Sequence, residues 1–92
     1  MIYILKFSGK LGNEKHQAEF YIGYCEEGRV NERLAEHRNG QGAAITRAAV
    51  ERGFELTIVL TLPGDRKTER RLKNRNNARL IVERALRGTL RL

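Results

Sequence analysis

Length, composition and charge restrict this chain to one globular domain. Its 92 residues can build one hydrophobic core but not two. Hydrophobic residues make up 40% and charged residues 32%, a balance that excludes disordered and membrane-spanning classes. The longest uncharged apolar-rich run, Leu56 to Leu62, is far shorter than the roughly 20 residues of a membrane span. The single cysteine, Cys25, excludes an internal disulfide, and the start lacks signal-peptide features, so we expect a cytoplasmic protein.

The positive charge of the chain is concentrated in its second half. Lys and Arg number 18 against 11 Asp and Glu, which gives a net charge of +7. Residues 1–46 are neutral overall, with six basic and six acidic side chains, whereas residues 47–92 carry twelve basic and five acidic ones. A localised excess favours a face that binds a polyanion such as nucleic acid. A well-solvated arginine-rich surface and a surface for an acidic protein remain the alternatives.

The first half begins with two strands. Residues 2–7 are β-branched and aromatic, and residues 18–24 have the same character, so both favour β-structure. The polar residues 8–17 between them predict a loop that joins the strands into an antiparallel pair. Because side chains alternate along a strand, Tyr21 and Gly23 are expected on one face.

Two helices and a third strand follow. Residues 29–38 favour a helix that ends at Asn39-Gly40, and the alanine-rich residues 43–52 favour a second helix. Alternation over residues 54–62 gives the clearest strand signal in the chain, and Pro63-Gly64 ends it.

Two further helices complete the chain. Asp65 is a plausible N-cap for a helix to about Arg75, and Asn76-Asn77 separates it from a last helix over 78–87. The element order is therefore β-β-α-α-β-α-α. This order predicts an α+β domain over residues 1–92, with a three-stranded, mainly antiparallel sheet flanked by helices.

Several short motifs follow one another along the chain, each on a different predicted strand or helix. Tyr3 lies on the first strand, Tyr21-Ile22-Gly23 on the second, and Arg33 and His37 one turn apart on the first helix. The Glu69-Arg70-Arg71-Leu72-Lys73 motif follows in the third helix. Together these motifs resemble those of the GIY-YIG nucleases, with Met1-Ile2-Tyr3 in place of Gly-Ile-Tyr. The resemblance spans nearly the whole chain and implies a metal-dependent endonuclease that hydrolyses phosphodiester bonds in DNA.

The resemblance also implies roles for individual side chains in hydrolysis. Tyr21 is the first candidate for water activation, with Tyr3 as its hydrogen-bond partner or as an alternative base. Arg33 would contact the scissile phosphate, and Arg29 is a possible substitute because the preceding segment is slightly long. As ordinary structural residues, the two tyrosines would instead be core partners on adjacent strands.

The remaining matched residues complete the implied site. His37 would orient the attacking water or a phosphate oxygen, and Gly23 would let the backbone approach the site closely. Glu69 would hold Mg²⁺ or Mn²⁺ together with waters and phosphate oxygens, although it could simply form an ion pair with Lys73. Asn77 is the first choice for the family asparagine, and Asn74 and Asn76 compete with it.

A basic stretch surrounds Glu69 and predicts contacts with the nucleic-acid backbone. Its cationic side chains are Arg66, Lys67, Arg70, Arg71, Lys73, Arg75 and Arg79. The expected partner is duplex or branched DNA. Because relatives usually carry a separate recognition domain, a partner protein or a homodimer is also possible. The alternative to an enzyme is a non-catalytic nucleic-acid-binding module that uses this 66–79 face.

Overall fold

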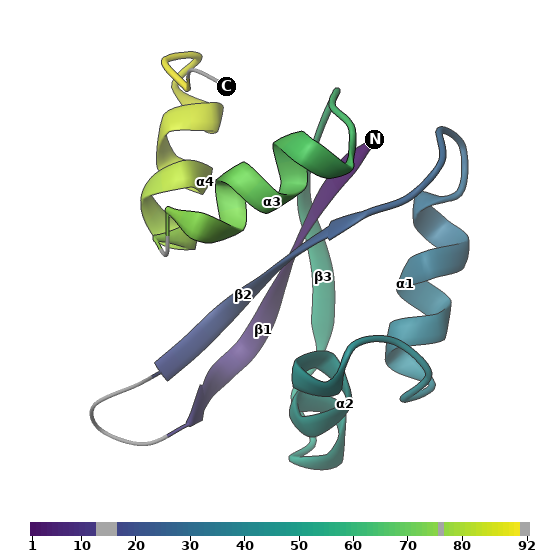
Figure 1. Ribbon diagram of the computed structural model, residues 1–92. Helices are drawn as coiled ribbons and strands as arrows, with labels where there is room; N and C mark the ends of the chain where they lie inside the picture. Colours follow the sequence, from purple (N-terminus) through teal and green to yellow (C-terminus); the bar gives the residue numbers. More distant parts are fainter. Residues whose placement is uncertain (13–16, 76, 91–92) are drawn as a thin grey trace.

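A computed structural model describes residues 1–12, 17–75 and 77–90 as a small sheet with helices packed on it (Figure 1). The strands are β1 (Ile2–Gly12), β2 (Gln17–Tyr24) and β3 (Leu56–Leu62). The helices are α1 (Val30–Arg38), α2 (Ala44–Glu51), α3 (Arg66–Asn74) and α4 (Ala78–Leu86). The predicted element order and the α+β class are confirmed.

The sheet is antiparallel throughout, in the order β2-β1-β3. The first strand is longer than predicted, because β1 continues to Gly12 through part of the expected loop. Its pairing with β2 shifts between Lys6 and Leu11, so the polar segment is accommodated as an irregular end of the hairpin. The rest of the expected loop, residues 13–16, lies outside the described residues.

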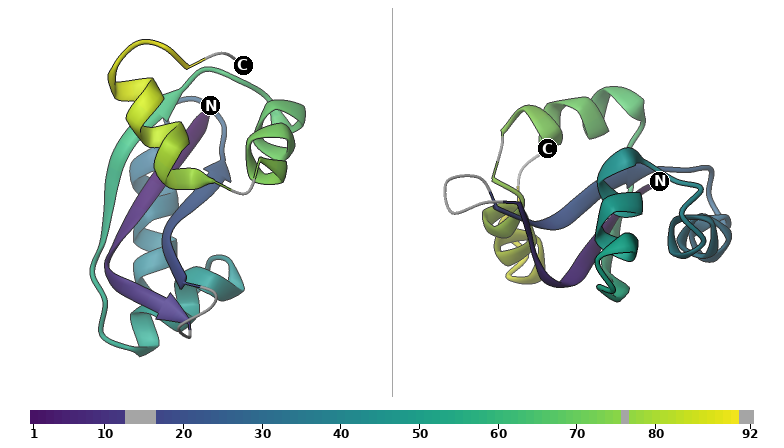
Figure 2. Two further views of the ribbon diagram at one scale, coloured as in Figure 1. Left: turned by 90° about the vertical axis from the view of Figure 1, so that its left-hand side faces the viewer. Right: turned by 90° about the horizontal axis from the view of Figure 1, so that it is seen from below.

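The helices cover the sheet in two pairs. On one face, Tyr3, Leu5 and Phe7 of β1 pack with Leu34 of α1 and Ala49 of α2. On the other face, the intervening β1 residues form a second cluster with α3 and α4; its buried members are Ile2, Ile4, Ile22, Leu72, Ile81 and Val82. Figure 2 shows α1 and α4 on opposite sides of the strands. Both faces of β1 are therefore buried, as expected for a central strand.

A β-bulge in β3 divides the side chains of that strand between the two clusters. Ile4 pairs with Leu60 while Leu5 pairs with Ile58, so Val59 is an extra residue on β3. Without the bulge, Ile58 and Leu60 would lie on one face. With it, Ile58 packs beside α1 and α2, and Leu60 packs beside α3 and α4.

Side-chain caps fix the start of both C-terminal helices. The predicted N-cap Asp65 is confirmed, because its Oδ1 accepts a hydrogen bond of 2.9 Å from the Thr68 backbone N–H. Asn77 caps α4 in the same way, with 3.2 Å between its Oδ1 and the Leu80 nitrogen. Among the described residues, every helix is too short or too polar to cross a lipid bilayer.

Candidate functional site

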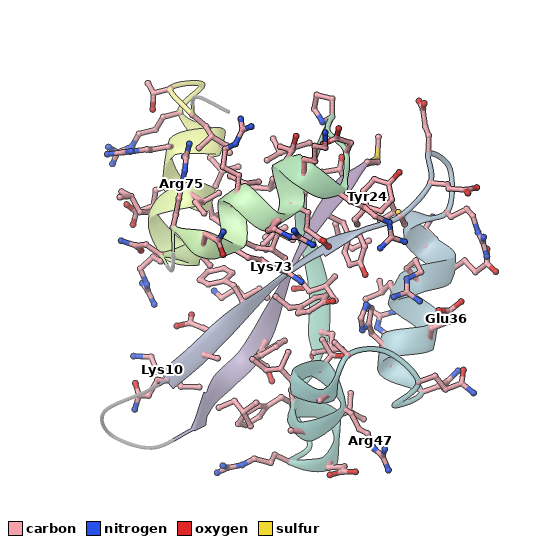
Figure 3. The ribbon with its side chains drawn as sticks, in the orientation of Figure 1. Lys10, Tyr24, Glu36, Arg47, Lys73 and Arg75 are labelled. Atoms are coloured by element: carbon pink, nitrogen blue, oxygen red, sulfur yellow. The ribbon has the colours of Figure 1, made fainter. Side chains whose placement is uncertain are left out.

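A polar groove of about 600 Å³ opens where the end of β2 meets α1 and α3. Tyr21 from β2, Arg33 from α1 and Glu69 from α3 all line it. Figure 3 shows the arrangement, with Tyr24 and Lys73 on the side of β2 and α3 and Glu36 on the side of α1. Three of the predicted catalytic residues, separated by up to 48 positions in the chain, therefore share one hollow.

Tyr3 and His37 lie beneath this groove rather than on its surface. Tyr3 is 1% exposed and His37 is fully buried, and the Tyr3 hydroxyl is 2.7 Å from His37 Nε2. The ring of Tyr21 lies above them, with its centroid 6.3 Å from that of Tyr3 and 5.1 Å from that of His37. In the β1–β2 register Tyr3 faces Gly23 and Leu5 faces Tyr21, so the tyrosines are diagonal neighbours.

The buried hydrogen bonds around His37 have one consistent direction. The Thr46 hydroxyl donates to the Ala43 carbonyl at 2.9 Å, so it accepts from His37 Nδ1–H, 2.8 Å away. With the proton on Nδ1, the neutral ring accepts from the Tyr3 hydroxyl through Nε2. Burial lowers the pKa of His37, and the positive charge of Arg33 lowers it further, so the neutral form is favoured.

This geometry corrects the expected role of His37. The ring does not line the groove, and both of its nitrogens already have partners inside the protein. His37 therefore does not reach a phosphate or a water in the groove. It instead holds the Tyr3 hydroxyl in a fixed orientation.

Two glycines leave the space that the rings of Tyr3 and His37 occupy. A Cβ on Gly23 would overlap the ring and hydroxyl of Tyr3, and a Cβ on Gly42 would overlap the imidazole of His37. Gly23 thus admits the Tyr3 side chain, which is a more specific role than access to the groove in general. Gly42 and Thr46 were not predicted, since an isolated Gly or Thr in this segment carries no sequence signal.

Arg33 connects the groove with the buried tyrosine. Its guanidinium forms an ion pair with Glu36, and its positive charge opposes the rise in the pKa of the buried Tyr3 hydroxyl. Arg29 also lines the groove, but it forms a bidentate pair with Glu32 on the exposed side of α1, with both N–O distances at 2.9 Å. Of the two candidate arginines, Arg33 is the one whose positive charge acts to lower the pKa of both Tyr3 and Tyr21.

Burial strongly favours the protonated form of both tyrosines. Burial raises the pKa of Tyr3 to about 12, and nearby Tyr21 adds to this, while the hydrogen bond and charge of Arg33 act in the opposite direction. Burial likewise raises the pKa of Tyr21, and the negative charge of Glu69 raises it further. Tyr3 is therefore unsuited to act as the alternative base, because it is both buried and difficult to ionise.

Glu69 is the acidic residue that faces the groove from α3. Its side chain is only 17% exposed, and its Oε2 is 3.8 Å from Lys73 Nζ, so the alternative i,i+4 ion pair does form. Lys73 Nζ is also 5.1 Å from the centroid of the Tyr21 ring. No cluster of three or more Asp, Glu, His or Cys side chains suited to a metal occurs within the described ranges. The donor set fits Mg²⁺ held by one carboxylate, with water and phosphate oxygens as the other ligands.

The basic side chains of residues 66–79 are all exposed, and two of them line the groove. Arg66 lies over the Tyr24 ring at 5.1 Å and Lys73 lies over Tyr21. Arg79 is further away and forms an ion pair with Glu19 at 2.6 Å.

The two candidate asparagines that the structure describes, Asn74 and Asn77, do not line the groove. Asn77 is occupied by its cap on α4. Asn76 lies outside the described residues.

Comparisons with known proteins do not place this chain in a group. No protein-family model matches it, no curated protein is significantly similar in sequence, and no solved structure matches its fold. The function therefore has to be argued from the groove itself.

Proposed function

We propose that the protein is a divalent-metal-dependent DNA endonuclease that hydrolyses phosphodiester bonds, as its resemblance to the GIY-YIG nucleases implies. One observation carries the proposal, namely that Tyr21, Arg33 and Glu69 line a single polar groove beside the basic helix α3. Hydrolysis needs a group that takes a proton from water, a cation that stabilises charge on the phosphate, and a site for a metal ion. The groove offers one side chain for each task.

Arg33 is suited to bind the scissile phosphate. Its planar guanidinium can donate two parallel hydrogen bonds to phosphate oxygens. The ion pair with Glu36, which also lines the groove, holds it at the wall. Tyr3 and His37 act behind it as positioning residues, since neither faces the groove.

Tyr21 is the candidate base, and the charge of Glu69 is one influence on how easily it ionises. Burial is the larger cause that raises the pKa of Tyr21, and the negative charge of Glu69 is the second. A divalent cation bound to Glu69 would supply positive charge beside the phosphate and the attacking water. Positive charge at Glu69 would offset the second cause of the raised pKa, so Tyr21 would lose its proton more readily.

The basic side chains of α3 would hold the DNA backbone against the groove. If about six phosphates are engaged, the logarithm of the binding constant should fall with the logarithm of salt concentration at a slope of roughly −5. Such contacts orient the substrate without reading its base sequence.

The substitution Glu69→Gln tests the enzyme proposal. Loss of a metal ligand worth several kcal/mol should slow plasmid nicking with Mg²⁺ or Mn²⁺ by about a hundredfold or more. Binding of the plasmid in a gel shift with EDTA should persist. Glu83→Gln, an exposed glutamate on α4 outside the groove, is the matched control and should nick at the normal rate.

Two results would redirect the proposal. Normal nicking by Glu69→Gln would remove this residue from the metal site. Salt-sensitive binding by the unaltered protein, with no nicking under either metal, would instead indicate the alternative function, a nucleic-acid-binding module that uses the exposed 66–79 face.

A further inference from the structure

A second hollow of about 490 Å³ adjoins the groove across β2. It lies between β2 and the junction of α3 with α4, and Lys73 lines both hollows. Figure 3 shows Lys73 on α3 above β2, with Lys10 beyond it toward the start of that strand. The groove and the second hollow are therefore neighbours, and Lys73 lies between them.

The second hollow combines positive charge with an apolar floor. Lys10, Lys73 and Arg79 line it, and the opposing carboxylate of Glu19 is paired with Arg79. Phe20 contributes a partly exposed ring to its floor. Cationic side chains bind phosphates, whereas an aromatic ring and an apolar floor suit the flat face of a base.

We propose that the second hollow binds unpaired nucleotides of the DNA strand whose phosphate lies in the groove. The inference rests on the proposed function for the identity of the partner as a nucleic acid. A volume of about 490 Å³ is in the range that takes a ligand of nucleotide size. The bases of an intact double helix are stacked inside it and cannot reach the Phe20 ring, whereas unpaired bases can. The substrate class is therefore DNA with a single-stranded segment beside the cleaved bond, such as a frayed end or a branch.

Binding measurements in EDTA separate this inference from catalysis. The probes are a blunt duplex, a duplex with an unpaired arm and a single strand, with fluorescence anisotropy as the readout. The unaltered protein should bind the armed duplex about tenfold more tightly than the blunt one, since each stacked base contributes measurably. Polyglutamate is added as a competitor to test for attraction by charge alone.

Substitutions locate the effect in the second hollow. Lys10→Ala and Phe20→Leu should each weaken binding of the armed duplex by about three- to tenfold and change blunt-duplex binding less than about twofold. Arg79→Ala should weaken binding of the armed duplex more than binding of the blunt duplex. The matched control is Arg84→Ala, because Arg84 is an exposed arginine on the same helix that lines neither hollow. It should leave binding of both probes within about twofold. Thermal unfolding of each variant confirms that the fold is retained.

Several outcomes would overturn the inference, and they can be distinguished from failure of the proposed function. Equal affinity for armed and blunt duplexes would overturn it, as would equal losses on both probes or displacement of the armed duplex by polyglutamate at matched charge. If metal-dependent nicking persists in any of these cases, the proposed endonuclease stands and only the second hollow is misassigned. Absence of binding to every probe would overturn both.

Discussion

Replacing Thr46 with Val tests the directed hydrogen bonds beneath the groove. The two side chains have nearly the same shape, so the change removes a hydroxyl without opening a cavity. The Ala43 carbonyl keeps a partner, because it also accepts from the Arg47 backbone N–H at 3.0 Å. The group left without a partner is His37 Nδ1–H, inside a ring that is fully buried.

The expected cost follows from that single orphaned donor. A buried polar group that loses its hydrogen bond costs about 1–3 kcal/mol in the free energy of unfolding. For a chain of this length, each 1 kcal/mol lowers the melting temperature by about 4–8 °C. The ring can avoid the orphaned donor only by moving its proton to Nε2. That change would make His37 a donor to Tyr3 and force the tyrosine hydroxyl to turn.

Urea unfolding and nitrogen NMR of the imidazole measure the two consequences. The unaltered protein should show the Nδ1–H tautomer, and Thr46→Val should lose stability and shift toward Nε2–H. Thr46→Ser is the control, because it keeps the hydroxyl and should keep the tautomer while losing about 1 kcal/mol for the buried methyl group. An Nε2–H tautomer in the unaltered protein, or a Thr46→Val variant as stable as the original, would refute the assigned direction.

Three further predictions concern Tyr3, His37 and Gly23 beneath the groove. Gly23→Ala should cost about 1–3 kcal/mol, because the added Cβ overlaps the Tyr3 ring; an unchanged urea midpoint would show that the ring has room to move. The raised pKa of Tyr3, about 12 against an ordinary 10, means that its contribution to stability is present below pH 10 and is lost as the pH rises toward 12. In an absorbance titration Tyr3→Phe should therefore remove the step near pH 12, and survival of that step would assign it to another tyrosine. Because the pKa of His37 is lowered below 6.5 by burial, its contribution to stability is present above pH 6.5 and is lost as the pH falls toward the folded pKa. His37→Gln should reduce the fall in the free energy of unfolding with decreasing pH, measured by urea unfolding. The same pH dependence in the variant and the original protein would contradict this prediction.

The predicted elements depended on local signals, which explains their agreement with the structure. β-branched and aromatic composition identified β1 and β2, and alternation identified β3. Asp65 identified the start of α3, because an N-cap acts within one turn. The bulge at Val59 had no such signal. It lets β3 supply side chains to two core clusters, one under each helix pair on opposite faces of the sheet. The length of β1 was underestimated because irregular pairing tolerates polar residues and glycine.

Part of the groove was predicted, but from the resemblance to a family and not from local signals. That Tyr21, Arg33 and Glu69 would meet followed from an ordered set of motifs, not from periodicity or composition. The positions of Tyr3 and His37 below the groove could not be predicted, because burial depends on α2 packing over them. Thr46 illustrates the same limit: a threonine in an alanine-rich helix acquires its role only when the imidazole of α1 lies beside it.

The position of the tyrosines gives the protein a built-in optical reporter. The chain has three tyrosines and no tryptophan, so its ultraviolet emission comes from tyrosine alone. Tyr21 and Tyr24 line the groove and Tyr3 lies directly beneath it. Any molecule that enters should alter this emission, so occupancy can be followed in the unlabelled protein without a background from distant chromophores.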